Sequence, residues 1–231
     1  MRPLPALEVL DDLCLRSLTL PGPERRLLLR LHALARRLQG GPLAGHAATL
    51  LARIPEEAVV LLATGAGAPP HLPAGETDGP PGVIFLAQAL RDLRRARPVL
   101  LTEGRMLASL RAAAAAANLA ALDEELPEGP ASPDAARLLL ARHRPAALVM
   151  VEKLGENERG VIHDMRGEDV GASHASLAPL VAAAKEAGAL TVSIGDRGNE
   201  VGFGLLAGSL PAAALRRRRC VCPCGGTILS S

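Results

Sequence analysis

The sequence predicts an α/β fold, in the form of a three-layer sandwich with a mainly parallel sheet flanked by helices. Short continuous apolar runs, such as 58–63 and 146–151, are typical of strands that are buried on both faces of a sheet. These runs alternate along the chain with segments of helical periodicity, which indicates parallel strands joined by helices. A length of 231 residues suits this architecture. We therefore expect a single domain over 1–231 that begins with a helical lead-in, 1–55.

The first half of the chain is expected to supply the lead-in and two strands. Residues 5–53 carry leucines at helical spacing with arginines between them, and Gly40-Gly41-Pro42 ends one helix. The apolar run 58–63 is the first predicted strand, and a loop rich in glycine and proline follows it over 64–82. The next predicted elements are a helix over 83–93, a strand over 97–101 and a helix over 105–122.

The second half continues the alternation. Its predicted elements are a loop over 124–133, a helix over 134–143 capped by Ser132, a strand over 146–151, a helix over 177–187 and a strand over 189–194. In parallel sheets the loops after the carboxyl ends of the strands carry the functional site. Three of these loops combine acids with glycines, namely 64–82, 152–169 and 195–204, and we expect them to meet at one edge of the sheet.

Composition argues against several classes of function. The formal net charge is +2 and aromatic residues make up 1% of the chain, so neither a polyanion-binding surface nor a base-stacking platform is expected. No apolar run approaches the 18 residues of a membrane span. The first twelve residues include three acids, unlike a secretory signal, and the cysteines form no disulfide framework. We expect a cytoplasmic protein without a nucleic-acid or membrane partner.

Three weaker motifs are interpreted as incidental. Gly65-Ala66-Gly67 begins like a dinucleotide fingerprint, but Pro70 stands where the third glycine belongs, and no P-loop occurs, so we expect no organic cofactor. Cys220, Cys222 and Cys224 have a spacing that differs from the C-x₂-C pairs of structural zinc sites. The run 216–219 is four arginines, but it lacks the basic and aromatic surroundings of a polyanion site.

The segment Glu76-Thr77-Asp78-Gly79-Pro80-Pro81-Gly82 is more informative. It places two carboxylates and a hydroxyl directly before a predicted helix whose entry the prolines stiffen. A helix N-terminus offers free N–H groups and positive potential, which suits a carboxylate or phosphate ligand. The alternative is a capped turn in which Thr77 or Asp78 only satisfies the end of the helix. The residues alone leave both interpretations open.

A second rich loop covers 195–204. Its four glycines let the backbone approach a ligand closely, and Asp196, Asn199 and Glu200 supply oxygen ligands or proton-transfer groups. Such an oxygen-only set is preferred by hard cations such as Mg²⁺. The alternative is a glycine-rich turn with solvated acids. Glu152, at the end of the third predicted strand, adds a third acidic strand end to the same edge of the sheet.

These segments occur in an order that resembles a known family. Thr64-Gly65 after a strand, Glu76–Gly82, Val151-Glu152, Gly160–Gly167 and Gly195–Gly202 together resemble the C-terminal domain of D-glutamate cyclase and its bacterial relatives, long filed as a domain of unknown function. The resemblance covers most of the chain from about residue 58. Ala66 replaces an aromatic residue of the family and Arg197 replaces a glycine, which would be strained if its φ were positive. The chain also stops at Ser231, before a further strand and a Ser-Asn-Trp-Gly segment of the family, so we expect a shorter C-terminal end.

The resemblance implies a lyase that condenses D-glutamate intramolecularly to 5-oxo-D-proline and water. It indicates where the site lies and not which carboxylate has which role, and we assign acid, base or metal roles to Glu76 and Asp78 or to Asp196 and Glu200. It places substrate binding on Thr64, Gly65, Thr77, Gly79, Gly82, Glu152 and Asn199. The expected ion is Mg²⁺ or Mn²⁺, held by Asp78, Asp196 and Glu200.

Two other functions remain open at this point. One is a non-catalytic domain that binds an amino acid or another small carboxylate, and the other is a metal-dependent enzyme acting on a phosphorylated metabolite. In each case the partner is a small molecule, here expected to be an acidic amino acid, and a homo-oligomer is compatible with the sequence.

Overall fold

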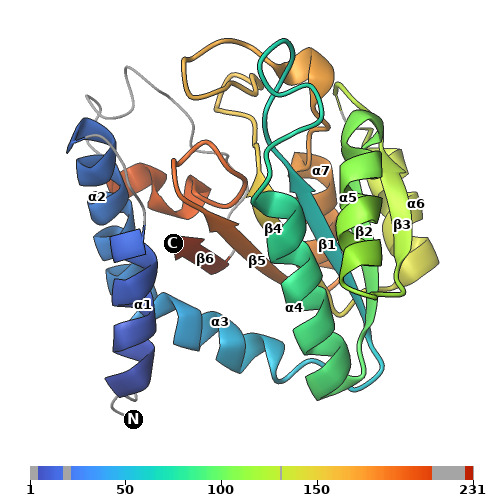
Figure 1. Ribbon diagram of the computed structural model, residues 1–231, viewed down its shortest axis with the longest axis horizontal. Coiled ribbons are helices and arrows are strands. Elements are labelled where there is room, and N and C mark those ends of the chain that lie inside the picture. The colour runs from blue at the N-terminus through green and yellow to red at the C-terminus, as the bar shows by residue number, and fades with distance from the viewer. Residues whose placement is uncertain (1–4, 18–21, 131, 210–226, 231) are drawn as a thin grey trace.

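The computed structural model describes residues 5–17, 22–130, 132–209 and 227–230, and its centre is a parallel six-stranded sheet (Figure 1). The strand order is β3-β2-β1-β4-β5-β6. The strands are β1 (Val59–Gly65), β2 (Arg97–Glu103), β3 (Leu122–Leu126), β4 (Ala147–Lys153), β5 (Leu190–Gly195) and β6 (Thr227–Ser230). The predicted α/β class with a mainly parallel sheet is therefore confirmed, and every strand pair is parallel.

Helices cover both faces of the sheet. They are α1 (Pro5–Ser17), α2 (Gly22–Gln39), α3 (Leu43–Leu51), α4 (Gly79–Arg94), α5 (Gly104–Ala116), α6 (Pro133–His143) and α7 (Ala178–Glu186), with short 3₁₀ helices at Gly171–Ser173 and Gly204–Ser209. Residues of α3, α4 and α5 share one buried core with the strands, and residues of α6 and α7 share a second core with the other face. Burial on both faces explains why β1 and β4 are apolar along almost their whole length.

The helical lead-in packs at the β6 end of the sheet, where α2 and α3 both contact β6 (Figure 1). Leu31 and Ala35 of α2 and Leu43 of α3 form a separate buried cluster with Phe203 and Leu206, which follow β5. The lead-in therefore supports the end of the glycine-rich 195–204 loop and the residues directly after it. Among the described residues, no helix is both long and apolar enough to cross a membrane.

The predicted loop over 124–133 is wrong in its first part, because residues 122–126 form the edge strand β3. Among the described strands it pairs with β2 alone, and its acids Asp123, Glu124 and Glu125 are not fully buried. An edge strand does not need the continuous apolar run that marks a central strand, so the pattern missed it. The preceding helix correspondingly ends at Ala116 instead of 122.

Two helix starts show how local sequence sets the boundaries. Helix α4 begins at Gly79, four residues before the predicted start, with prolines in its first turn and Asp78 as its N-cap. Helix α6 is capped as predicted by Ser132, whose hydroxyl accepts from the N–H groups of Asp134 and Ala135 at 3.2 and 3.5 Å. The motifs at Arg216–Arg219 and Cys220–Cys224 lie outside the described residues.

Candidate active site

The carboxyl ends of β1, β4 and β5 lie side by side in the sheet and bring three acidic loops together. The strand order changes direction between β1 and β4, and such a switch point is where ligands bind in open α/β sheets. Glu152 is the penultimate residue of β4, while Asp196 and Glu200 follow β5. One ligand atom from each of these three carboxylates lies within 4.8 Å of the others.

Glu152 owes its position to an irregularity in β4. Thr64 pairs with Val151, but the next residue, Gly65, pairs with Lys153, so Glu152 has no partner on β1. Its φ is +46°, in the left-handed region that side chains other than glycine and asparagine rarely adopt. Backbone strain of this kind persists where the surrounding structure enforces it, and it is common at functional sites.

Burial and crowding shift the pKa values of the clustered acids upward. Burial raises the pKa of Glu152 to about 10, and four neighbouring carboxylates add to the effect, namely Glu200, Asp196, Asp78 and Glu76. Burial together with the Asp196 charge raises the pKa of Glu200 to about 7. Burial also raises the pKa of Asp196, although Arg197, whose Nε lies 3.1 Å from Asp196 Oδ2, opposes the shift. The cluster therefore carries more carboxylates than it can ionise together at neutral pH.

Glu76 joins the cluster from the β1–α4 loop. Burial, with Asp78 and Asp196, raises the pKa of its carboxyl group. Glu76 and Glu152 line the same small cavity, which is also lined by Thr64 and Gly79. The loop that precedes α4 and the end of β4 thus face one hollow.

The start of α4 has no free N–H group for a ligand. Asp78 Oδ1 accepts from the Gly79 N–H at 2.9 Å, the two following prolines have none, and the Gly82 N–H donates to the Asp78 carbonyl at 3.0 Å. The capping interpretation of Asp78 therefore holds, and an anion at this helix start would experience only its positive potential. Asp78 and Thr77 are exposed.

Gly79 and Gly65 allow close packing between elements at this edge. A Cβ atom on Gly79 would overlap Thr64 Oγ1 and lie 3.5 Å from Glu152 Cβ, and one on Gly65 would overlap the Glu103 carboxylate. Gly82 is less crowded, with Val151 at 3.0 Å. Their predicted role in substrate binding stays a prediction, but the packing alone requires glycine at Gly79 and Gly65.

The loop after β5 is organised by Glu200. Its Oε1 accepts from the N–H groups of Asp196 and Arg197 at 3.3 and 3.0 Å, and its Oε2 accepts from Gly198 at 2.8 Å. These bonds wrap the loop around one buried carboxylate, and Asp196 lies in the same group of acids as Glu152 and Glu200. Positive φ in this loop falls on Gly198 and Gly202, not on Arg197, so arginine is unstrained there.

Two buried oxygen atoms at the site lack a partner among the described residues. Asn199 donates its Nδ2 to the His163 carbonyl at 3.1 Å, which leaves Oδ1 unpaired, and Thr64 Oγ1 is also unpaired. Both residues are more than 90% buried. Buried polar atoms are normally satisfied, so these two are available to a ligand.

The three acids whose oxygens lie together differ from the predicted metal set by one residue. Glu152 belongs to the group, while Asp78, on the rim, does not. The donor set is purely carboxylate and amide oxygen, which fits Mg²⁺ or Mn²⁺ better than zinc. A wider, mainly apolar groove between β3, α6 and α7 lies away from this site.

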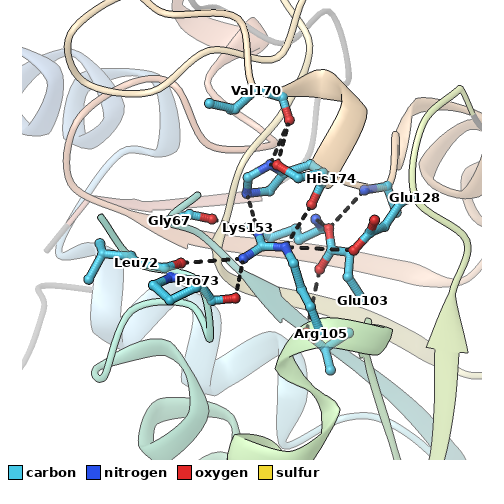
Figure 2. Close-up of polar contacts among 12 residues, drawn as sticks. Gly67, Leu72, Pro73, Glu103, Arg105, Glu128, Lys153, Val170 and His174 are labelled. Atoms are coloured by element: carbon cyan, nitrogen blue, oxygen red, sulfur yellow. Dashed lines mark hydrogen bonds and ion pairs between the residues drawn. The ribbon is translucent and has the colours of Figure 1, made fainter. Parts of the chain in front are cut away.

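A network next to the site was not foreseen from the sequence (Figure 2). Glu103, at the end of β2, forms a fully buried ion pair with Lys153, the residue after Glu152. Burial alone would raise the pKa of Glu103, but the charge and hydrogen bond of Lys153 hold it below the ordinary value. Two features of the sequence could have indicated this pair: Glu103 is another acid at a strand end, and Lys153 is one of only two lysines in the chain.

Fold and site together describe an α/β protein with a carboxylate-rich site at the switch point of a parallel sheet. Residues 26–229 match the family model described as D-glutamate cyclase-like, C-terminal. The chain belongs to this family. No curated protein matches the chain.

One solved structure with some likeness is the alanine–glyoxylate aminotransferase from Nostoc sp. It is 15% identical with a TM-score of 0.28, and the match covers 83% of this chain and 40% of that one. The chain thus spans well under half of that structure's length. A TM-score this low does not show a shared fold or a shared function.

Proposed function

We propose that the protein condenses D-glutamate to 5-oxo-D-proline and water with the help of Mg²⁺ or Mn²⁺ bound at Glu152, Asp196 and Glu200. The main support for the proposal is the crowding of Glu200, which is buried, and Glu152 and Asp196, which are half-buried, with Glu76 and Asp78 at the ends of β1, β4 and β5. Membership of the D-glutamate cyclase-like family supports the substrate but does not by itself establish the reaction.

Charge is the main reason to include a cation. Glutamate brings two carboxylates of its own, and they would be repelled by a cluster that already cannot ionise fully. A divalent ion would neutralise the cluster, lower the raised pKa values of its ligands and take up the unpaired Asn199 Oδ1. When bound, such an ion supplies Lewis acidity that polarises a carboxyl oxygen.

Glu76 is the best placed residue for proton transfer. In the reaction the substrate nitrogen forms a bond to the γ-carboxyl carbon while one carbon–oxygen bond breaks. The ammonium group loses two protons in total, and the leaving oxygen gains two and departs as water. A carboxylate with a raised pKa accepts a proton from nitrogen and returns it to oxygen more readily than an ordinary one. We assign both transfers to Glu76, acting in succession.

Thr64 and Asp78 would orient the substrate. Thr64 Oγ1 is buried beside Glu152 and lines the cavity shared with Glu76, so it can donate to a substrate carboxylate. Asp78 lies at the rim and can attract the substrate ammonium group. Holding the amine against the γ-carboxyl group provides the proximity on which a ring closure depends.

The decisive experiment is to incubate the purified protein with D-glutamate, with Mn²⁺ or with EDTA, and to measure 5-oxoproline by chiral mass spectrometry. We expect product only with the ion, and turnover at least about a hundredfold slower in Glu76→Gln. Glu168→Gln, which changes an exposed acid of the 152–169 loop, is the matched control and should retain full turnover. Binding of D-glutamate without product would favour the non-catalytic alternative and contradict the proposal.

A further inference from the structure

Arg105, in the first turn of α5, gathers backbone carbonyl groups from two separate loops (Figure 2). Its Nη2 donates to Gly67 O at 2.5 Å, and its Nη1 lies 3.4 and 3.2 Å from the carbonyl oxygens of Leu72 and Pro73. On the other side its Nε donates to Ser173 O at 3.0 Å. One guanidinium group therefore ties the β1–α4 loop to the segment before α7.

The first of these loops carries Glu76. A hydrogen bond from the Glu76 N–H to Ala66 O at 3.0 Å joins the two ends of this loop. A second bond, from the Gly75 N–H to Leu72 O at 3.1 Å, closes the turn before Glu76. The three carbonyls bound by Arg105 belong to the interior of this same closed loop. The position of Glu76 relative to the acidic cluster consequently depends on where Arg105 holds the loop.

The second loop anchors Arg105 itself. His174 is fully buried, and burial followed by the charge of Lys153 lowers the pKa of its imidazole to about 4, so the ring is neutral. A neutral ring donates from Nδ1 to Val170 O at 3.0 Å and accepts from Arg105 with Nε2 at 3.3 Å. Next to it the Ala175 N–H donates to Glu103 Oε1 at 2.8 Å, which joins this loop to the buried Glu103–Lys153 pair.

Only arginine has the donors for this arrangement. The guanidinium group presents five N–H donors in a rigid planar fork, whereas a lysine ammonium group is a single point with three rotating donors. The Arg105 side chain is only 15% exposed, and its nearest carboxylate in an ion pair is Glu128 at 3.6 Å, which is a loose contact. Most of its close partners are neutral carbonyls, so its geometry matters more than its charge.

We propose that Arg105 is a positioning residue that holds Glu76 in the acidic cluster by fixing the 66–76 loop. The catalytic part of this proposal rests on the proposed function of Glu76, whereas the fixing of the 66–76 loop by Arg105 does not depend on that function. In this role Arg105 acts through Glu76 and does not contact the substrate.

The test compares Arg105→Gln and Arg105→Lys with Arg111→Gln. Arg111 is the matched control, because it lies on the same helix and its side chain, 61% exposed, pairs with Asp123 away from the loop. Hydrogen exchange should show the amides of Gly75 and Glu76 exchanging at least about tenfold faster in both Arg105 variants, with helix α4 unchanged. Arg111→Gln should match the wild type throughout.

Steady-state kinetics distinguish a positioning role of Arg105 from a purely structural one. Arg105→Gln should lower kcat for D-glutamate by at least about tenfold with KM changed less than about threefold, and Arg105→Lys should rescue little of the loss. Combining Arg105→Gln with Glu76→Gln should lower the rate no further than Glu76→Gln alone, since the first change acts through the second residue.

Three results would overturn the inference. Unchanged exchange at Gly75 and Glu76 in both Arg105 variants would remove the clamp, and equally faster exchange throughout the protein would show general destabilisation instead. Full additivity of the two substitutions would show that Arg105 acts independently of Glu76. If the wild type forms no 5-oxoproline, the proposed reaction fails, while the exchange comparison still decides whether Arg105 fixes the loop.

Discussion

Replacing Glu152 with glutamine should stabilise the ion-free protein at neutral pH. The folded protein holds the pKa of this carboxyl group at about 10, far above its usual value of 4.5, chiefly through burial and then through the charges of Glu200 and Asp196. Between these two pKa values the folded protein binds more protons than the unfolded chain, so stability falls as pH rises through that range. Glutamine mimics the protonated acid and removes this cost.

The size of the effect follows from the distance between the pH and the ordinary pKa. At pH 7 that distance is about 2.5 units, which corresponds to roughly 3 kcal/mol. For a protein of this length such a gain raises the thermal midpoint by about 6–12 °C. At pH 5 the distance is only about half a unit, so the gain should fall below about 1 kcal/mol.

The assay is thermal unfolding followed by circular dichroism in EDTA at pH 5, 6, 7 and 8, for the wild type, Glu152→Gln and the surface control Glu168→Gln. A second series adds Mn²⁺, which should stabilise the wild type by about 2.7 kcal/mol at one hundred times its dissociation constant and Glu152→Gln much less. The two proteins should therefore approach or exchange their order of stability when the ion is added. A midpoint for Glu152→Gln that is unchanged or lower in EDTA at pH 7 would refute the reasoning, because it would show that Glu152 is not confined among other carboxylates.

Three further predictions follow from the same geometry. Asp196→Asn should abolish Mn²⁺ binding in calorimetry and leave the thermal midpoint unchanged or higher, because it removes one charge from a crowded set of carboxylates. A fall in the midpoint of about 5 °C or more with ion binding intact would instead indicate a structural ion pair. Gly79→Ala should lower the free energy of unfolding, measured with denaturant, by about 1–3 kcal/mol, since the added methyl group would overlap Thr64. Gly41→Ala is the control and should be nearly neutral, because a carbon added at Gly41 meets nothing within 4 Å. Lys153→Met should cost about 3–5 kcal/mol in the same assay by leaving the Glu103 carboxylate buried and unpaired, and a loss below about 1 kcal/mol would contradict the buried pair.

The central strands and the family could be predicted because their signals are local. A strand covered on both faces must be apolar along its length, and β1 and β4 are. The Glu76–Gly82 and Gly195–Gly202 segments are likewise specific enough in composition to identify the family, which the match over 26–229 confirms. The edge strand β3 lacks such a signal because only one of its edges pairs and its acids remain partly solvated.

For the candidate site, the meeting of the three acidic loops could be predicted from the sequence, because parallel strands all present their carboxyl ends at the same edge of a sheet and the acids follow strand ends. The arrangement of these acids at that edge comes from the tertiary structure. It placed Glu152 with Asp196 and Glu200 through a one-residue irregularity in β4, used Asp78 to cap α4, and wrapped the 195–204 loop around Glu200. It also brought Arg105 against a loop more than thirty residues earlier in the chain. Register shifts, hydrogen-bond partners and burial arise from contacts between segments far apart in the chain, and a residue's own neighbours in sequence do not encode them.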